Sequence, residues 1–337
     1  MSELELLEDA LDDVFTRERA ADAGLEETWA RLESAGLTLV GVPEALGGAG
    51  GDPAQAAAVA RLCGLHAVAL PIPETALLAG WLLAGAGLSV PVGPLTAASG
   101  ELAVERSSGG TSVRGSLWNV PQARVADHLV VLAGGLVLVV PAGSLEIEPG
   151  VNVASEPRDT VRLDVVVPAE RTALSPVGHE ALRERGALVR ACQTAGALER
   201  VLELTVRQVC EREQFGRPLG RFQAVQQQVA VLAGEAAAAR AAVDLAVACP
   251  SRLATAIAKT RAGEAATSGA KIAHQLHGAI GVTEEHELHR FTLRLLAWRD
   301  EYGNEREWAA VIGREVAGRD LWECLDALRT APVPPLA

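Results

Sequence analysis

The apolar residues of this chain recur with a helical period at both ends and with a period of two in the middle. Near the N-terminus Leu4, Leu7 and Leu11 have helical spacing, and the segments 195–209 and 225–243 repeat that pattern. From about residue 89 to 172 the period is two. This order predicts an α+β fold, mainly α, with an N-terminal helical domain, a middle antiparallel β domain and a C-terminal four-helix bundle.

Local signals help to set the boundaries. Asp52 followed by Pro53 predicts the start of a helix, with Asp as N-cap and Pro in the first position. Gly134-Gly135, flanked by two apolar runs, predicts a β-hairpin. The boundaries that we predict are 1–88 for the helical domain, 89–172 for the β domain, 173–330 for the bundle and 331–337 for a frayed tail.

Composition excludes several classes of protein. No apolar run approaches the ~20 residues that a membrane span needs. Residues 1–20 are acidic and lack an apolar stretch, so we expect no signal peptide and a cytoplasmic location. The net charge of −13 argues against a nucleic-acid surface. The five cysteines are scattered, which is typical of reduced thiols and not of a zinc or redox motif.

Residues 212–223 read Arg-Glu-Gln-Phe-Gly-Arg-Pro-Leu-Gly-Arg-Phe-Gln and interrupt two helical patterns. Main-chain N–H groups at a helix start and the planar fork of Arg212 both suit a diphosphate. The same residues would also form an ordinary helix–helix turn with solvated arginines. A second turn, Gln-Leu-His-Gly-Ala-Ile-Gly at 275–281, permits close approach of a ligand at its glycines, or simply ends a helix.

These two motifs, the order of the regions and the Val-Pro-Glu-x-x-Gly-Gly-x-Gly run at 42–50 resemble the acyl-CoA dehydrogenase flavoprotein family. The likeness covers nearly the whole chain and implies an FAD-dependent oxidation of an acyl-CoA thioester between its α and β carbons. In that family the two motifs bind FAD across a subunit interface.

The resemblance assigns cofactor-binding roles residue by residue. Arg212, Gln214, Phe215 and Gln223 would contact the ADP half of one FAD. Gln275, Gly278 and Ala279 would contact the FAD of the adjoining site, with Ala279 standing where a glycine is usual.

The chain departs from the family pattern in two places, the segment that lines the flavin ring and the position of the catalytic base. The family's Thr-Glu-Pro-x-x-Gly-Ser-Asp-like segment, which lines the flavin ring, is absent, and the region is shortened to 95–103. The catalytic glutamate, which removes the α proton, is also displaced. In many relatives it lies in a Tyr-Glu-Gly turn, where this chain has Tyr302 with Glu301 adjacent; others place it in the first bundle helix, near Glu184. Each of these glutamates could also be a solvated helix carboxylate, in which case this subunit carries no catalytic base.

Four histidines suggest a metal site, because His274 and His277, and likewise His286 and His289, are three residues apart. The family resemblance explains this segment as an ordinary helix start after the glycine turn. We therefore expect no metal.

We interpret the chain as a short acyl-CoA dehydrogenase subunit that most resembles bacterial members acting on steroid side-chain or other bulky acyl-CoAs. There, two unlike subunits form an α2β2 assembly, share one FAD per heterodimer and pass electrons to an electron-transfer flavoprotein or a similar acceptor. The alternatives are a self-sufficient homotetramer that uses Glu301 or Glu184, and a scaffold subunit without chemistry.

Overall fold

The computed structural model describes residues 2–21 and 24–330, and the chain falls into two compact units. The first comprises the described residues up to 59 and residues 69–186. The second comprises residues 60–68 and the described residues from 187 onward. The division at residues 88 and 172 stays a prediction, and the tail expected at 331–337 lies outside the described residues.

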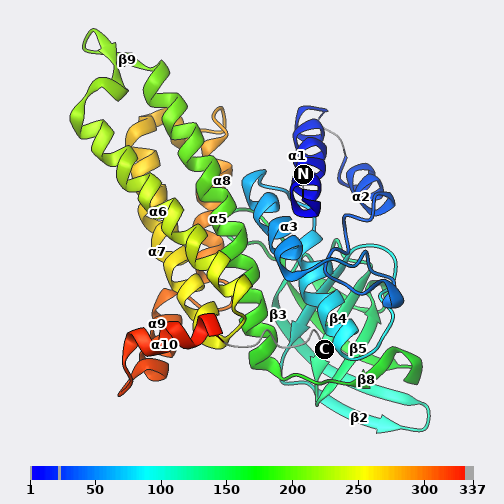
Figure 1. Ribbon diagram of the computed structural model, residues 1–337. Coiled ribbons are helices and arrows are strands. Elements are labelled where there is room, and N and C mark those ends of the chain that lie inside the picture. The colour runs from blue at the N-terminus through cyan, green and yellow to red at the C-terminus, as the bar shows by residue number, and fades with distance from the viewer. Residues whose placement is uncertain (1, 22–23, 331–337) are drawn as a thin grey trace. The chain divides into compact units, whose positions relative to one another are not determined.

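The N-terminal part of the chain is helical, as the apolar period predicts (Figure 1). Its elements are α1 (Glu3–Ala21), α2 (Leu25–Ser34), the 3-10 turn η1 (Glu44–Leu46), α3 (Pro53–Leu65), the π-helix η2 (Glu74–Gly80) and α4 (Trp81–Gly85). The helix start predicted at Asp52 and Pro53 is confirmed, because Oδ1 of Asp52 accepts a hydrogen bond from N of Gln55 over 2.8 Å.

The β part contains two four-stranded sheets, ordered β1-β4-β5-β8 and β2-β3-β7-β6. The first sheet consists of β1 (Leu95–Ser99), β4 (His128–Ala133), β5 (Leu136–Pro141) and β8 (Thr172–Leu174). The second consists of β2 (Ala103–Ser107), β3 (Gly110–Pro121), β7 (Arg158–Val167) and β6 (Glu146–Glu148). Apolar side chains of both sheets form one core cluster, which includes Val131, Leu138 and Val161.

The sheets are antiparallel, as predicted, with the exception of the pair β1 and β4. These two strands are parallel, since the chain leaves the first sheet after β1 and forms β2 and β3 in the second before it returns as β4. The hairpin predicted at Gly134-Gly135 joins β4 to β5. Both glycines have positive φ, 57° and 74°, which a tight two-residue turn of this kind requires.

The second unit is a bundle of long helices (Figure 1). Its elements are α5 (His179–Glu211, entering from the first unit), β9 (Glu213–Gln214), β10 (Arg217–Pro218), η5 (Leu219–Arg221), α6 (Gln223–Ala248), α7 (Arg252–His277), η6 (Gly278–Val282), α8 (Leu288–Asp300), α9 (Glu305–Val316) and α10 (Leu321–Thr330). None of the helices among the described residues has the length and apolar character to cross a membrane.

Small residues let these helices approach closely. A Cβ added to Gly269 of α7 would lie 2.7 Å from Cδ2 of Leu198 on α5. The end of α3 contacts α5 even more tightly, because a Cβ on Gly196 would lie 1.9 Å from the carbonyl oxygen of Arg61. A Cβ on Gly64 would be equally close to the carbonyl oxygen of Gln193. The low aromatic content of the chain thus goes with close backbone packing in this unit.

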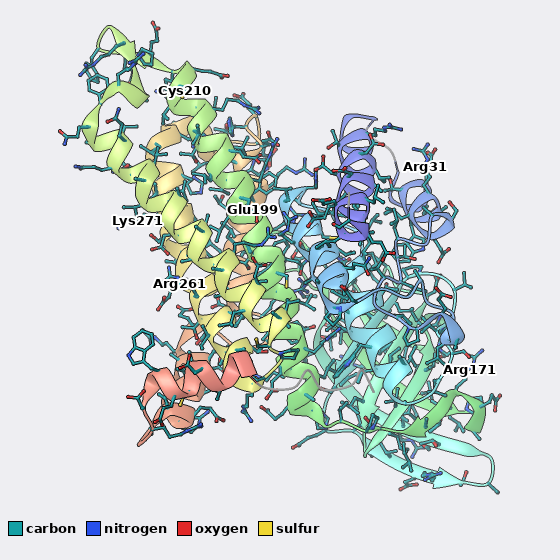
Figure 2. The ribbon with its side chains drawn as sticks, in the orientation of Figure 1. Arg31, Arg171, Glu199, Cys210, Arg261 and Lys271 are labelled. Atoms are coloured by element: carbon teal, nitrogen blue, oxygen red, sulfur yellow. The ribbon has the colours of Figure 1, made fainter. Side chains whose placement is uncertain are left out.

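Ion pairs reinforce the crossing of α3 on α5. Glu199 of α5, labelled in Figure 2, accepts hydrogen bonds from Arg61 over 2.8 Å and from Arg240 of α6 over 3.0 Å. One carboxylate therefore joins three segments of the second unit, and the Arg61 side chain that it binds is only 12% exposed.

Candidate FAD-binding cavity and candidate bases

A tight hairpin separates α5 from α6. Gln214 of β9 pairs with Arg217 of β10, and the turn between them is formed by Phe215 and Gly216, with φ of 55° and 78°. Phe215 lies at the tip of the hairpin, is 88% exposed, and makes an edge-on contact with the ring of Phe222. The break that the sequence predicts between two helices is therefore a short β-hairpin with an exposed phenylalanine in its turn.

The end of α7 lies beside the end of α5. Gly278 ends α7 with φ of 67°, a conformation that favours glycine. Nη1 of Arg212 donates to the carbonyl oxygen of His277 over 3.0 Å. This hydrogen bond joins the motif at 212–223 directly to the motif at 275–281.

The two motifs line one cavity of about 300 Å³. Its walls are formed by Arg212, Gln214, Leu219, Ala224, Val225, Gln228, Gln275, Leu276 and Gly278. Within the described residues Arg212 forms no ion pair, so its positive charge is not neutralised by a carboxylate. An arginine of this kind at a cavity wall, with amide side chains around it, is suited to bind an anionic group.

Four of the seven predicted cofactor-binding residues line this cavity, namely Arg212, Gln214, Gln275 and Gly278. Phe215, Gln223 and Ala279 do not line it. The resemblance assigns the two motifs to adjoining sites, whereas residues of both motifs line this single cavity.

Gln228 also lines the cavity, and the sequence did not single it out. Its Oε1 is buried and has no hydrogen-bond partner among the described residues. Gln228 is the last of three consecutive glutamines. Only the phase of α6 decides which of them faces the cavity, and that phase could have been counted from the apolar face of the helix.

The two candidate bases have different surroundings. Nε of Arg190 on α5 donates to Oε2 of Glu301 over 2.6 Å, and the side chain of Arg190 is only 1% exposed. Arg190 also donates to Oε1 of Gln193. Glu301 is thus held in an ion pair inside the second unit, while Glu184 lies on the part of α5 that belongs to the first unit.

The turn that contains Glu301 is fixed from three helices. Besides Arg190 on α5, Nζ of Lys259 on α7 donates to the carbonyl oxygens of Trp298 and Arg299 at the end of α8. Nε1 of Trp308 on α9 donates to the carbonyl oxygen of Tyr302 over 3.0 Å. Burial lowers the pKa of Lys259 to about 7, against the opposing influence of the Glu301 carboxylate.

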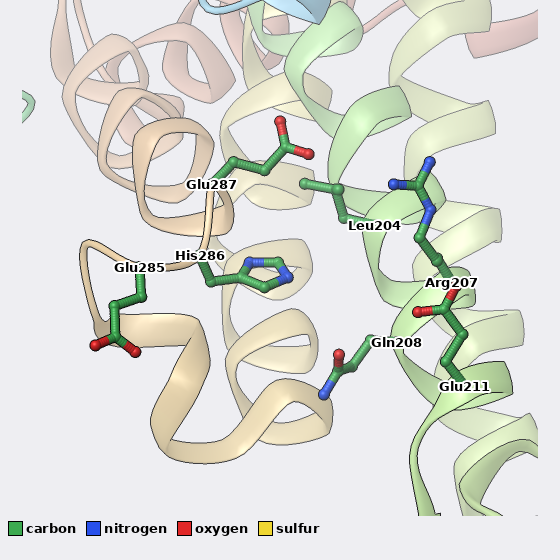
Figure 3. Close-up of a pocket in the computed structure, with 7 residues that line it drawn as sticks. All are labelled: Leu204, Arg207, Gln208, Glu211, Glu285, His286 and Glu287. Atoms are coloured by element: carbon green, nitrogen blue, oxygen red, sulfur yellow. The ribbon is translucent and has the colours of Figure 1, made fainter.

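A second cavity of about 340 Å³ lies between α5 and the loop before α8 (Figure 3). Its lining residues are Leu204, Arg207, Gln208, Glu211, Glu285, His286 and Glu287. The ring of His286 packs edge-on against the buried ring of His277, with centroids 4.8 Å apart. Across residues 2–21 and 24–330, no three His, Cys, Asp or Glu side chains are grouped to hold a metal ion.

The β part with two sheets, followed by a helical bundle, has the fold of solved acyl-CoA dehydrogenase-type structures, and the relatives of the chain indicate the class of FAD-dependent oxidoreductases that act on CH–CH bonds. The sequence pattern of the acyl-CoA dehydrogenase C-terminal domain matches residues 181–315. The chain belongs to the acyl-CoA dehydrogenase family.

Three members of the family or solved structures illustrate how far the similarity extends along the chain. Acyl-CoA dehydrogenase IpdE2 of Mycobacterium tuberculosis is 34% identical over 282 residues, which are 82% of this chain and 82% of that protein. One chain of the M. tuberculosis ChsE4–ChsE5 complex is 25% identical, with a TM-score of 0.83 over 95% of this chain and 99% of that one. A variant of the Tcur3481–Tcur3483 steroid acyl-CoA dehydrogenase is 26% identical, with a TM-score of 0.81 over 94% and 98%.

These similarities confirm the predicted family, the fold class and the prediction of an acyl-CoA dehydrogenase-type subunit. The assignment of individual cofactor-binding and catalytic residues stays a prediction.

Proposed function

We propose that the cavity lined by Arg212, Gln214, Gln275 and Gly278 binds the ADP half of FAD. When bound, FAD supplies the hydride acceptor for the removal of two hydrogens from an acyl-CoA. The observation that carries the proposal is the convergence of both motifs on one cavity around an arginine that has no carboxylate partner among the described residues.

Each residue contributes a different property to the proposed site. Arg212 offers a planar fork to phosphate oxygens, and its hydrogen bond to the carbonyl oxygen of His277 orients that fork. Gly278 allows the backbone to turn with positive φ directly at the wall. The buried and unpartnered Oε1 of Gln228 needs a donor, which a nucleotide hydroxyl or amino group would supply.

We infer that a paralogous subunit completes the flavin site. This chain lacks the Thr-Glu-Pro-like segment that lines the flavin ring in the family, and a related solved structure is a complex of two proteins, ChsE4 and ChsE5. The proposed assembly is α2β2, its substrate a bulky acyl-CoA of the steroid side-chain kind, and its electron acceptor an electron-transfer flavoprotein or a protein of similar function.

We further propose that this subunit supplies no catalytic base. A general base in this reaction needs a carboxylate that is free to accept a proton near the substrate. Glu301 instead accepts a hydrogen bond from the buried guanidinium of Arg190, which stabilises the ionised carboxylate. Its role in the proposal is to hold the turn between α8 and α9.

Co-expression with a longer paralogue that carries the missing segment, followed by a flavin-to-protein ratio, tests the proposal. We expect the complex to retain about one FAD per heterodimer, as one shared site between two chains requires. Arg212→Gln should weaken FAD binding by about tenfold or more, because charge-assisted hydrogen bonds to phosphate contribute about 1.5–3 kcal/mol each. Arg221→Gln is the matched control, since Arg221 is exposed on η5 and does not line the cavity.

Three results would count against parts of the proposal. Stoichiometric FAD in the isolated chain, with bleaching by acyl-CoA, would establish the self-sufficient homo-oligomer. Full activity of a complex that carries both Arg212→Ala and Gln275→Ala would favour the scaffold. Equal losses of FAD in Arg212→Gln and Arg221→Gln would contradict the binding of FAD in this cavity.

A further inference from the structure

His277 lies at the junction between the core of the bundle and the proposed cofactor cavity. Its carbonyl oxygen accepts the hydrogen bond from Arg212, and its neighbours Leu276 and Gly278 line the cavity. The residue itself is fully buried and does not line the cavity, and its ring packs against that of His286. One residue thus contributes a buried imidazole to the bundle and the carbonyl group that orients Arg212.

The hydrogen bonds of His277 define which of its nitrogens carries the proton. Nδ1 lies 2.8 Å from the carbonyl oxygen of Ala273. Since a carbonyl oxygen can only accept, Nδ1 donates and Nε2 is the bare nitrogen of a neutral ring. Nε2 is buried and has no partner among the described residues. A proton added there would create a buried cation without an acceptor.

Packing around His277 leaves little room for adjustment. A Cβ on Gly281 would lie only 2.7 Å from Cβ of His277, so η6 is pressed against the histidine. The ring of His286 packs against it from the loop before α8. One turn earlier on α7, Nε2 of His274 lies 3.0 Å from Oγ1 of Thr292, and the Nδ1 of His274 is buried without a partner among the described residues.

The charged groups near this cluster come from three elements. Arg212, at the end of α5, faces the carbonyl oxygen of His277, and His274 faces it along α7 itself. The loop before α8 contributes His286, which lines the second cavity (Figure 3). The remaining ionisable residues around that cavity are Arg207 and Glu211 on α5 and Glu285 and Glu287 on the loop.

We propose that His277 is a positioning residue for the cofactor cavity, and that proton uptake by its imidazole opens the junction of α7 and η6 and weakens the binding of a nucleotide diphosphate. This inference rests on the proposed function of the cavity. It adds a pH-dependent element to that function, because the neutral ring is the only form that the buried position accommodates.

The direction of the pH effect follows from burial. Burial lowers the pKa of His277, and the neighbouring His286 and His274 lower it further, against the opposing effect of the hydrogen bond to Ala273. Burial also lowers the pKa of His274. The open state, with an ordinary histidine pKa, thus binds more protons than the closed state. The closed state is therefore favoured at higher pH and is lost as the pH falls below about 6.5.

The test is a titration of the purified complex with FAD at a series of pH values between about 5.5 and 7.5. One proton taken up by the open state with an ordinary histidine pKa should raise the Kd for FAD at the acid end, by at most about tenfold. His277→Gln should bind FAD normally at the neutral end with a Kd that changes by less than about twofold across the series, because its amide can donate to Ala273 but does not titrate.

Two further variants keep the test independent of folding. His277→Leu, which removes the hydrogen bond as well, should show a raised but pH-independent Kd. His179→Gln is the control, since His179 is exposed at the start of α5 and should leave the pH dependence of the parent unchanged. His277→Gln, which has no imidazole to titrate, reports any effect of pH on the ligand itself.

The outcomes separate this inference from the proposed function. If FAD binds at none of the pH values, the proposed function is wrong. If FAD binds and its Kd is independent of pH, or if His277→Gln keeps the full pH dependence, the role of His277 is overturned. Faster hydrogen exchange of residues 274–288 at the acid end, relative to α6 and after correction for intrinsic rates, is the structural change that we expect. Unchanged protection of that segment would contradict it.

Discussion

The guanidinium of Arg190 and the carboxylate of Glu301 form an ion pair over 2.6 Å inside the helical bundle, where the arginine side chain is 1% exposed. The pair joins the long helix α5 to the turn between α8 and α9. Arg190 further donates to Gln193, and its guanidinium carbon lies 5.8 Å from the centre of the Tyr302 ring. Removal of either partner of such a buried ion pair should lower the stability of the protein strongly, because the remaining charge is left buried and unpaired.

Arg190→Met should lower the free energy of unfolding by about 3 kcal/mol, because removal of one partner leaves the other charge uncompensated. The double variant with Glu301→Gln should recover part of that loss. Urea unfolding of the four proteins of this cycle measures the coupling. Arg162→Met, in an exposed pair with Glu146 and Glu148, should change stability little. Equal losses in both arginine variants would contradict a special role for the buried pair.

Glu301→Gln should leave the turnover of the complex within about threefold of the parent, since removal of a true general base costs about 10²–10⁴ in rate. Steady-state kinetics with an acyl-CoA, at matched flavin content, provide the measurement. A loss of that larger size, with FAD content and Tm unchanged, would assign the base to Glu301 and support the self-sufficient enzyme. Glu184→Gln examines the other candidate in the same assay.

The stability of the protein should rise with pH above neutrality because of Lys259. Its folded pKa of about 7 lies below the ordinary 10.5, so between these values the unfolded chain binds the extra proton. Stability then increases with pH, with a slope of at most about 1.4 kcal/mol per pH unit from this one group. Lys259→Met should remove that contribution. Parallel pH profiles of unfolding free energy for parent and variant would contradict a lowered pKa of Lys259 in the folded protein.

Gly196→Ala should destabilise the protein by about 3 kcal/mol or prevent folding, because its Cβ would lie 1.9 Å from the carbonyl oxygen of Arg61. Gly234→Ala is the matched control on α6, where no atom outside the local helix lies within 4 Å of the added Cβ. That substitution should raise stability by up to about 1 kcal/mol through helix propensity. Thermal unfolding compares the two, and similar Tm values would refute the close crossing of α3 on α5.

Local signals in the sequence predicted elements whose geometry depends on few neighbours. Asp52 with Pro53 begins a helix, and Gly134 with Gly135 turns a hairpin, for reasons contained in those residues alone. The family motifs were also contained in short segments. What they did not reveal is that Arg212 reaches the carbonyl group of His277, since that contact depends on how α5 and α7 end in space.

The burial of charged side chains could not be predicted from the spacing of apolar residues. Arg190 and Lys259 are almost fully buried, yet a periodicity argument assigns arginine and lysine to solvent. Lys259 lies among the small residues of α7, where buried Ala256 and Ala262 leave space for its chain, and its amino group finds carbonyl acceptors on another helix. Glu301 was singled out for its position in the sequence, while its partner Arg190 was not, because the pairing joins residues far apart along the chain.

The close contacts at Gly64 and Gly196 join residues 60–68 to α5, and they limit how the helical bundle can be exchanged between related proteins. Residues 60–68 belong to the second unit although the whole β part follows them in the chain. A fragment that begins at residue 173 would thus expose the face of α5 that α3 covers. Any recombination that exchanges the helical bundle between paralogous subunits must bring this short upstream segment with it, so the two stretches are expected to evolve as a linked pair.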